Sequence, residues 1–199
     1  MFFFFPYRFV QGGLPLAPDR TLTDDRMNGN ATDNIPSRDE CMDLMDQYGM
    51  LPNIVDHSRQ VMHVSLAIVD HLQNRAGIDR ERVLAGALLH DITKTRSLET
   101  KERHDASGGA LLRERGYVRI AEIVEQHVVL RDFNPHGDLE EREIVFYADK
   151  RVMHDKVVTL DERIADLLQR YGKTEEIRRR ILENLSSVYA VEDKIARFL

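Results

Sequence analysis

The stretch ALLHDITKT, residues 87–95, runs from an apolar segment directly into side chains that bind metals and phosphates. Its first three residues are typical of a protein core, whereas His90 and Asp91 follow side by side and Lys94 comes about one helical turn later. A buried charge destabilises a protein unless it is paired or bound to a metal. The stretch therefore indicates a helix that anchors itself in a core and delivers polar ligands at its end.

The composition fits one domain of ordinary size. The chain has 199 residues, 42% of them hydrophobic, which suffices for a full core. Its net charge of -6 argues against long nucleic acids, which require a basic face. Cys41 is the only cysteine, which excludes an intramolecular disulfide and fits a reducing compartment. No apolar run approaches the ~20 residues of a membrane span, and the opening MFFFFPYRFV is a poor signal peptide. We therefore expect a cytoplasmic protein without membrane contact.

Helical periodicity predicts an all-α fold that begins near Ser37. Residues 1–36 carry many prolines and glycines and no helical period, so we expect a poorly structured N-terminal extension, followed by one domain over residues 37–199. Ser37, Asn53 and Asp79 are assigned as helix caps. Caps, glycine stops and apolar spacing predict helices over 38–48, 53–75, 80–90, 103–115, 118–129, 139–157, 160–171 and 174–197, with connections over 93–102 and 134–137.

Two of these predicted helices carry a polar residue on an apolar face. His57 shares its face with Val61, Val64, Ile68 and Leu72. Asp149 falls within a stripe formed by Ile144, Val145, Ala148, Val152 and Met153. An ionised carboxylate in such a stripe must be paired or bound to a metal. For Asp149 alone, pairing with a lysine or arginine across the core explains the pattern equally well.

Further histidines and an aspartate on other predicted helices join His57 and Asp149. The full set is His57, His90, Asp91, His104, His127 and Asp149. A helical bundle builds an internal metal site from side chains on facing helices, which requires this kind of scatter. Four imidazoles and two carboxylates suit one or two divalent transition metals, iron or manganese first, with magnesium, nickel, cobalt and zinc as further options.

The set resembles the H…HD…D pattern of the HD-domain superfamily. His57, the doublet in LLHDITK and the aspartate in YADKRV carry the resemblance, which spans roughly residues 51–160. It is closest to small bacterial members with HDIxK, an H…SGG segment and an I…H segment, here residues 90–94, residues 104–109 and IVEQH ending at His127. Those members include hydrolases of diadenosine tetraphosphate. The resemblance implies a helical bundle with metal in its core, an HD domain with C-terminal helices over residues 37–199.

The resemblance also implies a role for each residue of the site. The ligands of one metal would be His57, His90, Asp91 and Asp149. His104 and His127 would hold a second metal, with Asp91 as the bridge, so two metals per chain are expected. Asp91 and Lys94 would act in catalysis. The residues that would bind the phosphate of the substrate are Lys94, Lys150 and Arg151.

The resemblance therefore predicts a metal-dependent phosphohydrolase. It would cleave a phosphate ester or anhydride of a small, anionic, nucleotide-like substrate with a metal-activated hydroxide. An HD-type di-iron oxygenase has the same ligand set and is one alternative, and a non-catalytic metal-binding signalling domain is the other. Four subsets of the superfamily are disfavoured. Residues 127–129 read HVV and lack the double histidine of HD nucleases, and no HDxxED of guanosine tetraphosphate hydrolases is present. Gly116-Tyr117 is followed by Val118 and not by the proline of the cyclic-di-GMP enzymes, and Lys94 replaces the glutamate of deoxynucleoside 5′-monophosphatases.

The remaining histidines and the last helix are assigned structural places. His63 and His154 are expected on the surface, His71 in the core or at an interface, and His136 in a solvated loop. The charged last helix is interpreted as a scaffold or an oligomer surface, which leaves a homodimer open.

Overall fold

A computed structural model describes residues 34–73 and 76–199 of the chain. The predicted N-terminal extension therefore lies outside the described residues, apart from residues 34–36. These three have no regular structure, and Ile35 packs against the hydrophobic core. The domain boundary at Ser37 stays a prediction.

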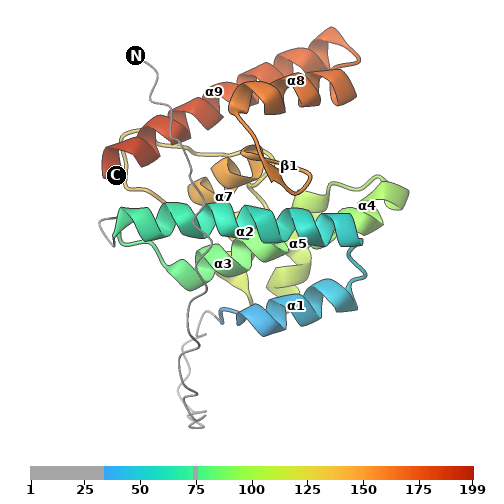
Figure 1. The fold of residues 1–199 in the computed structure, drawn as a ribbon. Helices are drawn as coiled ribbons and strands as arrows, with labels where there is room; N and C mark the ends of the chain where they lie inside the picture. Colours follow the sequence, from blue (N-terminus) through green and yellow to red (C-terminus); the bar gives the residue numbers. More distant parts are fainter. Residues whose placement is uncertain (1–33, 74–75) are drawn as a thin grey trace. The chain divides into compact units, whose positions relative to one another are not determined.

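The described part of the chain is helical apart from one short hairpin (Figure 1). Its helices are α1 (Arg38–Gln47), α2 (Pro52–Leu72), α3 (Arg80–Leu89), α4 (Lys94–Thr100), α5 (His104–Glu114), α6 (Val118–Val124), α7 (Glu141–Lys150), α8 (Leu160–Tyr171) and α9 (Glu175–Phe198). The strands β1 (Val152–Met153) and β2 (Lys156–Val157) pair antiparallel, with Val152 opposite Val157. The predicted all-α class is confirmed. None of the described helices combines the length and the apolar character that crossing a membrane requires.

The long helix α2 is the central element of the bundle. It packs against α3 and α7, while α3 also contacts α1, α6 and α7. Helix α5 packs on α6, and α8 and α9 form a hairpin that meets the bundle where α9 lies on α7. In Figure 1 this hairpin and α1 lie on opposite sides of α2 and α3. The predicted metal ligands lie on α2, α5 and α7, at the end of α3 and in the turn after α6.

Local hydrogen bonds explain where the helices begin. The Ser37 hydroxyl accepts from the Glu40 amide at 3.3 Å, and the Glu40 carboxylate accepts from the Ser37 amide at 2.7 Å, which confirms the capping box. The Asp79 carboxylate likewise caps α3. The cap at Asn53 is wrong, because α2 already begins at Pro52 with Leu51 as its N-cap. Proline suits the first helical position because its missing N–H needs no partner there.

Two predicted helix ends are also wrong, and one predicted connection contains a helix. The helix predicted over 139–157 ends at Lys150, and the chain turns into the β1–β2 hairpin, with a left-handed backbone at His154 (φ 57°). Val152 is fully buried in its strand, so an apolar residue there looked like one more helical position. The helix predicted over 118–129 ends at Val124, and the connection 93–102 contains α4.

A buried ion pair fixes the last helix to the bundle. Lys194 of α9 lies 2.8 Å from Glu143 of α7, and both side chains are fully buried. The Lys194 ammonium also donates to the Asn134 carbonyl at 2.9 Å, and Glu143 accepts from the Glu140 amide at 3.1 Å. Because a buried charge needs such partners, α9 is part of the core at this point.

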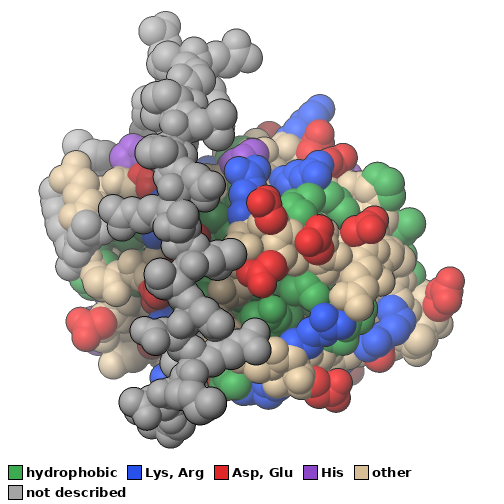
Figure 2. All heavy atoms as spheres, turned by 90° about the horizontal axis from the view of Figure 1, so that it is seen from below, with side chains coloured by type: hydrophobic (Ala, Val, Ile, Leu, Met, Phe, Trp, Pro, Cys, Tyr) green, Lys and Arg blue, Asp and Glu red, His purple; other side chains and the backbone are tan. Residues whose placement is uncertain are grey.

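Most other charged side chains of α9 behave differently. Arg180 and Glu176 pair at 2.5 Å, but both are more than 60% exposed. Exposed pairs of this kind contribute little to stability. On the face drawn in Figure 2, the acidic and basic side chains of the described residues are interspersed rather than gathered by sign.

Lys194→Met should destabilise the fold by about 3–5 kcal/mol, because it leaves the Glu143 carboxylate buried without its partner. Arg180→Met, on the exposed side of the same helix, is the control and should change stability by less than about 1 kcal/mol. Chemical denaturation followed by circular dichroism measures both. Equal effects of the two substitutions would contradict the assigned role of the pair.

Candidate metal centre

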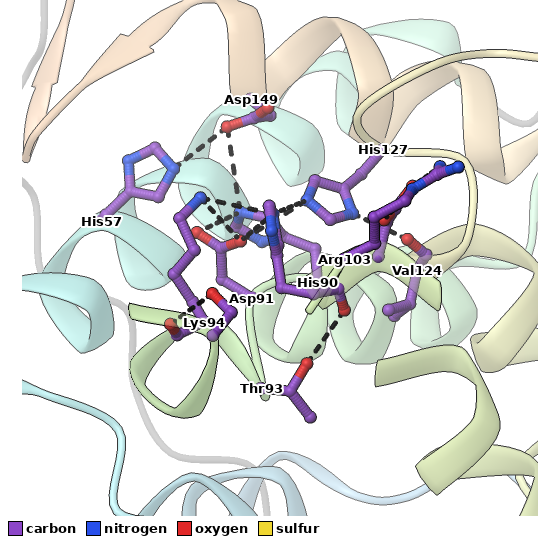
Figure 3. A network of polar contacts seen from close by, with 12 residues as sticks. His57, His90, Asp91, Thr93, Lys94, Arg103, Val124, His127 and Asp149 are labelled. Atoms are coloured by element: carbon purple, nitrogen blue, oxygen red, sulfur yellow. Dashed lines mark hydrogen bonds and ion pairs between the residues drawn. The ribbon is translucent and has the colours of Figure 1, made fainter. Parts of the chain in front are cut away.

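The structure brings all six residues of the predicted ligand set together (Figure 3). They come from five helices or their ends: His57 from the start of α2, His90 and Asp91 from the end of α3, His104 from the start of α5, His127 from the turn after α6, and Asp149 from the last turn of α7. In Figure 3 the side chains of His57, His90, His127 and Asp149 point toward one another.

Asp149 forms one half of the group with two histidines. Its Oδ1 lies 3.0 Å from Nε2 of His57 and 3.8 Å from Nε2 of His90. The donor atoms of these three residues lie close enough together to hold one metal ion.

Asp91 connects this half to the other one. Its Oδ2 lies 3.6 Å from Nε2 of His90. Its Oδ1 lies 3.1 Å from Nε2 of His104 and 3.4 Å from Nε2 of His127, and these two nitrogens are 3.1 Å apart. The two oxygens of one carboxylate thus face different histidines, and the donor atoms of His90, Asp91 and His127 lie close enough together to hold a metal ion.

Backbone carbonyls fix the orientation of three imidazoles. Nδ1 of His57 donates to the His154 carbonyl at 2.8 Å, Nδ1 of His90 to Ala87 at 2.8 Å, and Nδ1 of His127 to Val124 at 2.7 Å. A carbonyl can only accept, so each Nδ1 carries the proton, and Nε2 of His90 presents a lone pair to the group. Nε2 of His57 instead lies 3.0 Å from Asp149; burial opposes charge on His57, but the contact with Asp149 outweighs it and raises the pKa of His57. Metal-ligating histidines in proteins are held in this way.

One buried nitrogen at the centre lacks a hydrogen-bond partner. Nε2 of His90 is buried without a hydrogen-bond partner, and a buried polar atom in a native protein normally has one. Around Oδ1 of Asp91, Nε2 of His104 and Nε2 of His127 converge within 3.4 Å, and the Lys94 ammonium lies against the same oxygen. The donor set of nitrogen and oxygen atoms fits divalent transition metals.

The local charges keep both carboxylates ionised. Burial alone would raise the pKa of Asp91, but the surrounding histidines and Lys94 hold it well below its usual value. Burial likewise opposes ionisation of Asp149, and Lys150, His57 and His90 outweigh it, so its pKa is also low. Burial lowers the pKa of His90 to about 3. Neutral His90 and ionised aspartates are the protonation states that metal binding needs.

The three predicted phosphate-binding cations lie in different places. Lys94 is at the open edge, with Nζ 3.4 Å from Asp91 and 3.3 Å from Nε2 of His104, and its side chain is 35% exposed. Lys150 is buried deeper, and its Nζ donates to Asp149 at 2.5 Å and to the His127 carbonyl at 2.8 Å. Arg151 is not brought to the group: its guanidinium donates to the Val158 carbonyl and the Tyr147 hydroxyl.

Several groups outside the predicted ligand set support the site. The Thr93 hydroxyl donates to the His104 carbonyl at 2.9 Å and so fixes the start of α5. A Cβ at Gly109 would lie 2.2 Å from Cγ of Glu125, so the glycine lets α5 approach the segment that carries His127. The glycine pair of the SGG motif was a usable signal. The carbonyl of His154 left no signal in the sequence, because every residue type has a backbone carbonyl.

The other histidines stay apart from the group. His63 and His154 are exposed as expected, and His136 lies exposed in its loop. His71 was expected in the core or at an interface, and its exposure excludes the core. Its Nδ1 donates to the Ala67 carbonyl one turn earlier on α2.

A model of the HD domain matches residues 54–154, just over half of the chain. The chain belongs to the HD domain family. The matched segment contains every residue of the predicted ligand set: His57, His90, Asp91, His104, His127 and Asp149. The resemblance that the sequence suggested is therefore confirmed.

Relatives of this HD domain protein carry different names. A tRNA (cytidine(56)-2′-O)-methyltransferase of Picrophilus torridus is 28% identical over 68% of this chain and 42% of its own length. The enzyme of the same name from Thermoplasma volcanium is 34% identical over 47% of the chain and 26% of its own length. The chain thus spans less than half the length of these two relatives.

Two further proteins correspond to the chain over more of their own length. An uncharacterised protein of Methanocaldococcus jannaschii is 30% identical over 65% of this chain and 84% of its own length. A solved structure, of a predicted HD superfamily hydrolase from an uncultured Thermotogales bacterium, aligns with a TM-score of 0.47 at 18% identity over 84% of this chain and 97% of its own.

Divalent manganese or iron should raise the unfolding temperature of the wild type, because a ligand that binds only the folded state stabilises it, by about 2.7 kcal/mol at 100 times its Kd. His90→Gln should lose most of this increment, since His90 faces both halves of the group. His63→Gln, on the exposed face of α2, should keep it. Thermal unfolding with and without metal measures the difference, and equal increments in the two variants would contradict the assignment of His90.

Proposed function

We propose that this chain is a metal-dependent phosphohydrolase that cleaves a phosphate ester or anhydride of a small nucleotide-like substrate. One observation carries the proposal: the two oxygens of Asp91 face separate sets of histidines, and the ammonium of Lys94 stands beside Asp91 at the open edge. Membership of the HD domain family supports a hydrolytic reaction of this kind.

Two divalent ions per chain fit the donor set, with iron or manganese first. The ligands of the first ion would be His57, His90, Asp91 and Asp149. His104, His127 and a share of Asp91 would hold the second, which has less negative charge around it and should bind more weakly. When bound, such ions supply Lewis acidity and make water a better nucleophile near neutral pH.

The protein residues supply positioning and charge. Lys94 is flexible enough, and exposed enough, to turn its ammonium from Asp91 to a phosphate oxygen. Lys150 already donates to Asp149 and to the His127 carbonyl, so in this proposal it neutralises and orients a ligand rather than binding substrate. Arg151 has no part, because it contacts Tyr147 and Val158. Burial of His90, Asp91 and Asp149 limits the access of bulk water to these ligands.

Small substrates are favoured over a large nucleic acid. The chain carries a net charge of -6, and a phosphate-rich polymer requires an extended basic surface. The two methyltransferase relatives are named for a reaction on tRNA, but each is more than twice as long as the segment it shares with this chain. Their name therefore gives no reason to propose that reaction here.

A panel of nucleotides and other phosphate esters, offered to the manganese- or iron-loaded protein without oxygen, tests the proposal. Release of phosphate or of a nucleotide product under these conditions supports hydrolysis. Oxygen uptake with a non-phosphorylated substrate, and no hydrolysis across the panel, would favour the di-iron oxygenase, which has the same ligand set. Metal binding without any turnover would favour a signalling domain.

Lys94→Ala should lower kcat/KM on the order of 100-fold, because one cation that stabilises charge on the phosphate is lost. Its metal content should stay that of the wild type. Lys173→Ala, an exposed lysine at the tip of the α8–α9 hairpin, is the control and should be fully active. Loss of metal from the Lys94 variant would contradict its role as a substrate-binding residue.

The metal content of the wild type should approach two ions per chain in metal excess. His104→Ala and His127→Ala should each retain about one, because the Asp149 half stays complete. Asp91→Ala should hold close to none, since both halves use this carboxylate. Elemental analysis after gel filtration measures the content, with His136→Ala as the control. The two-metal proposal would be contradicted if the wild type bound only one ion per chain in metal excess and the His104→Ala variant were fully active.

A further inference from the structure

The segment that carries His127 has few backbone hydrogen bonds of its own. After α6 ends, the amide of Glu125 donates to Ala121 at 2.9 Å and the amide of Gln126 to Ile123 at 3.2 Å. Within the described chain, the backbone amides of residues 127–130 donate to no backbone carbonyl. The orientation of the 127–128 peptide must therefore come from other groups.

Two side chains from distant helices bind this peptide and its neighbour. Lys150 at the end of α7 donates to the His127 carbonyl at 2.8 Å. Asn184 of α9 donates through Nδ2 to the Val128 carbonyl, also at 2.8 Å. Asn184 lies outside residues 54–154, which the HD domain model matches.

The surroundings of Asn184 explain why this hydrogen bond matters. The residue lines a hollow between α8 and α9 whose other walls include Ile181, Leu185 and Val188. An amide on such an apolar surface is costly unless it is hydrogen-bonded. Within the described residues, the side chain of Asn184 makes this one hydrogen bond, to the Val128 carbonyl.

We propose that Asn184 is a positioning residue for His127. By holding the Val128 carbonyl it fixes the 128–129 peptide, next to the 127–128 peptide that Lys150 holds, so that Nε2 of the His127 imidazole stays 3.4 Å from Oδ1 of Asp91. The C-terminal hairpin thereby tunes the affinity of the His104–His127–Asp91 half of the group. The effect on metal affinity rests on the metal centre of the proposed function. The hydrogen bond between Asn184 and Val128 is independent of that proposal.

Asn184→Leu tests the inference. Leucine is close to asparagine in size, lacks the donor, and suits the apolar hollow, so the fold should be retained. The affinity for the second, weaker-bound metal should fall about tenfold, as for other residues that orient a ligand, and the affinity for the first should not change. Asn184→Gln, which keeps an amide donor, should recover part of the loss. Ser186→Ala, on the exposed side of α9, is the matched control.

A second measurement needs no metal. In the metal-free protein, the ring ¹⁵N and ¹H signals of His127 should shift or broaden in Asn184→Leu, while those of His57 stay in place. If the wild type hydrolyses nothing but these signals move, the positioning role stands and the proposed function falls. Unchanged metal affinity with unchanged His127 signals would overturn the inference. A loss of thermal stability alone would overturn it too, because Asn184 would then support only the fold.

Discussion

Two ionised carboxylates lie at the centre of a helical bundle, where apolar packing alone would make them costly. Asp91 is 6% exposed and Asp149 10%. What offsets this cost is a shell of four imidazoles and two lysines, so the site and the core cannot be separated. Each neighbouring element contributes: α2 and α3 bring histidines, α5 and the turn after α6 bring two more, and α7 brings Lys150 beside Asp149.

The second constraint is the direction of the imidazoles. Three of them donate a hydrogen bond from Nδ1 to a backbone carbonyl, and their Nε2 atoms face the centre of the group. Two of these carbonyls lie one turn earlier in the same segment, at Ala87 and Val124, so they come with the helix that carries the histidine. The third, at His154, depends on the β1–β2 hairpin. His57 thus relies on a residue with a left-handed backbone far along the chain, which ties the hairpin to the site.

The sequence was sufficient for the helical class, for two of the three assigned caps and for singling out the six side chains that the structure brings together, four of which have a local signal. His57 and Asp149 lie on apolar stripes, and His90-Asp91 ends a leucine-rich helix. Tertiary contacts gave no such signal. Lys150 and Arg151 are adjacent in sequence, yet one reaches Asp149 and the other Tyr147, since successive helical residues point about 100° apart. Backbone acceptors such as the carbonyl of His154 are independent of residue type.

The order of the ligands along the chain has a consequence for synthesis. His57 and Asp149 touch across 92 positions. A nascent chain that has left the ribosome only as far as α6 and the turn after it carries all four histidines and Asp91, but neither Asp149 nor Lys150. The four imidazoles then lack the carboxylate of Asp149 and the packing of helix α7. In the proposed metal centre, full coordination would wait for α7, and metal loading would then be a late step of biosynthesis.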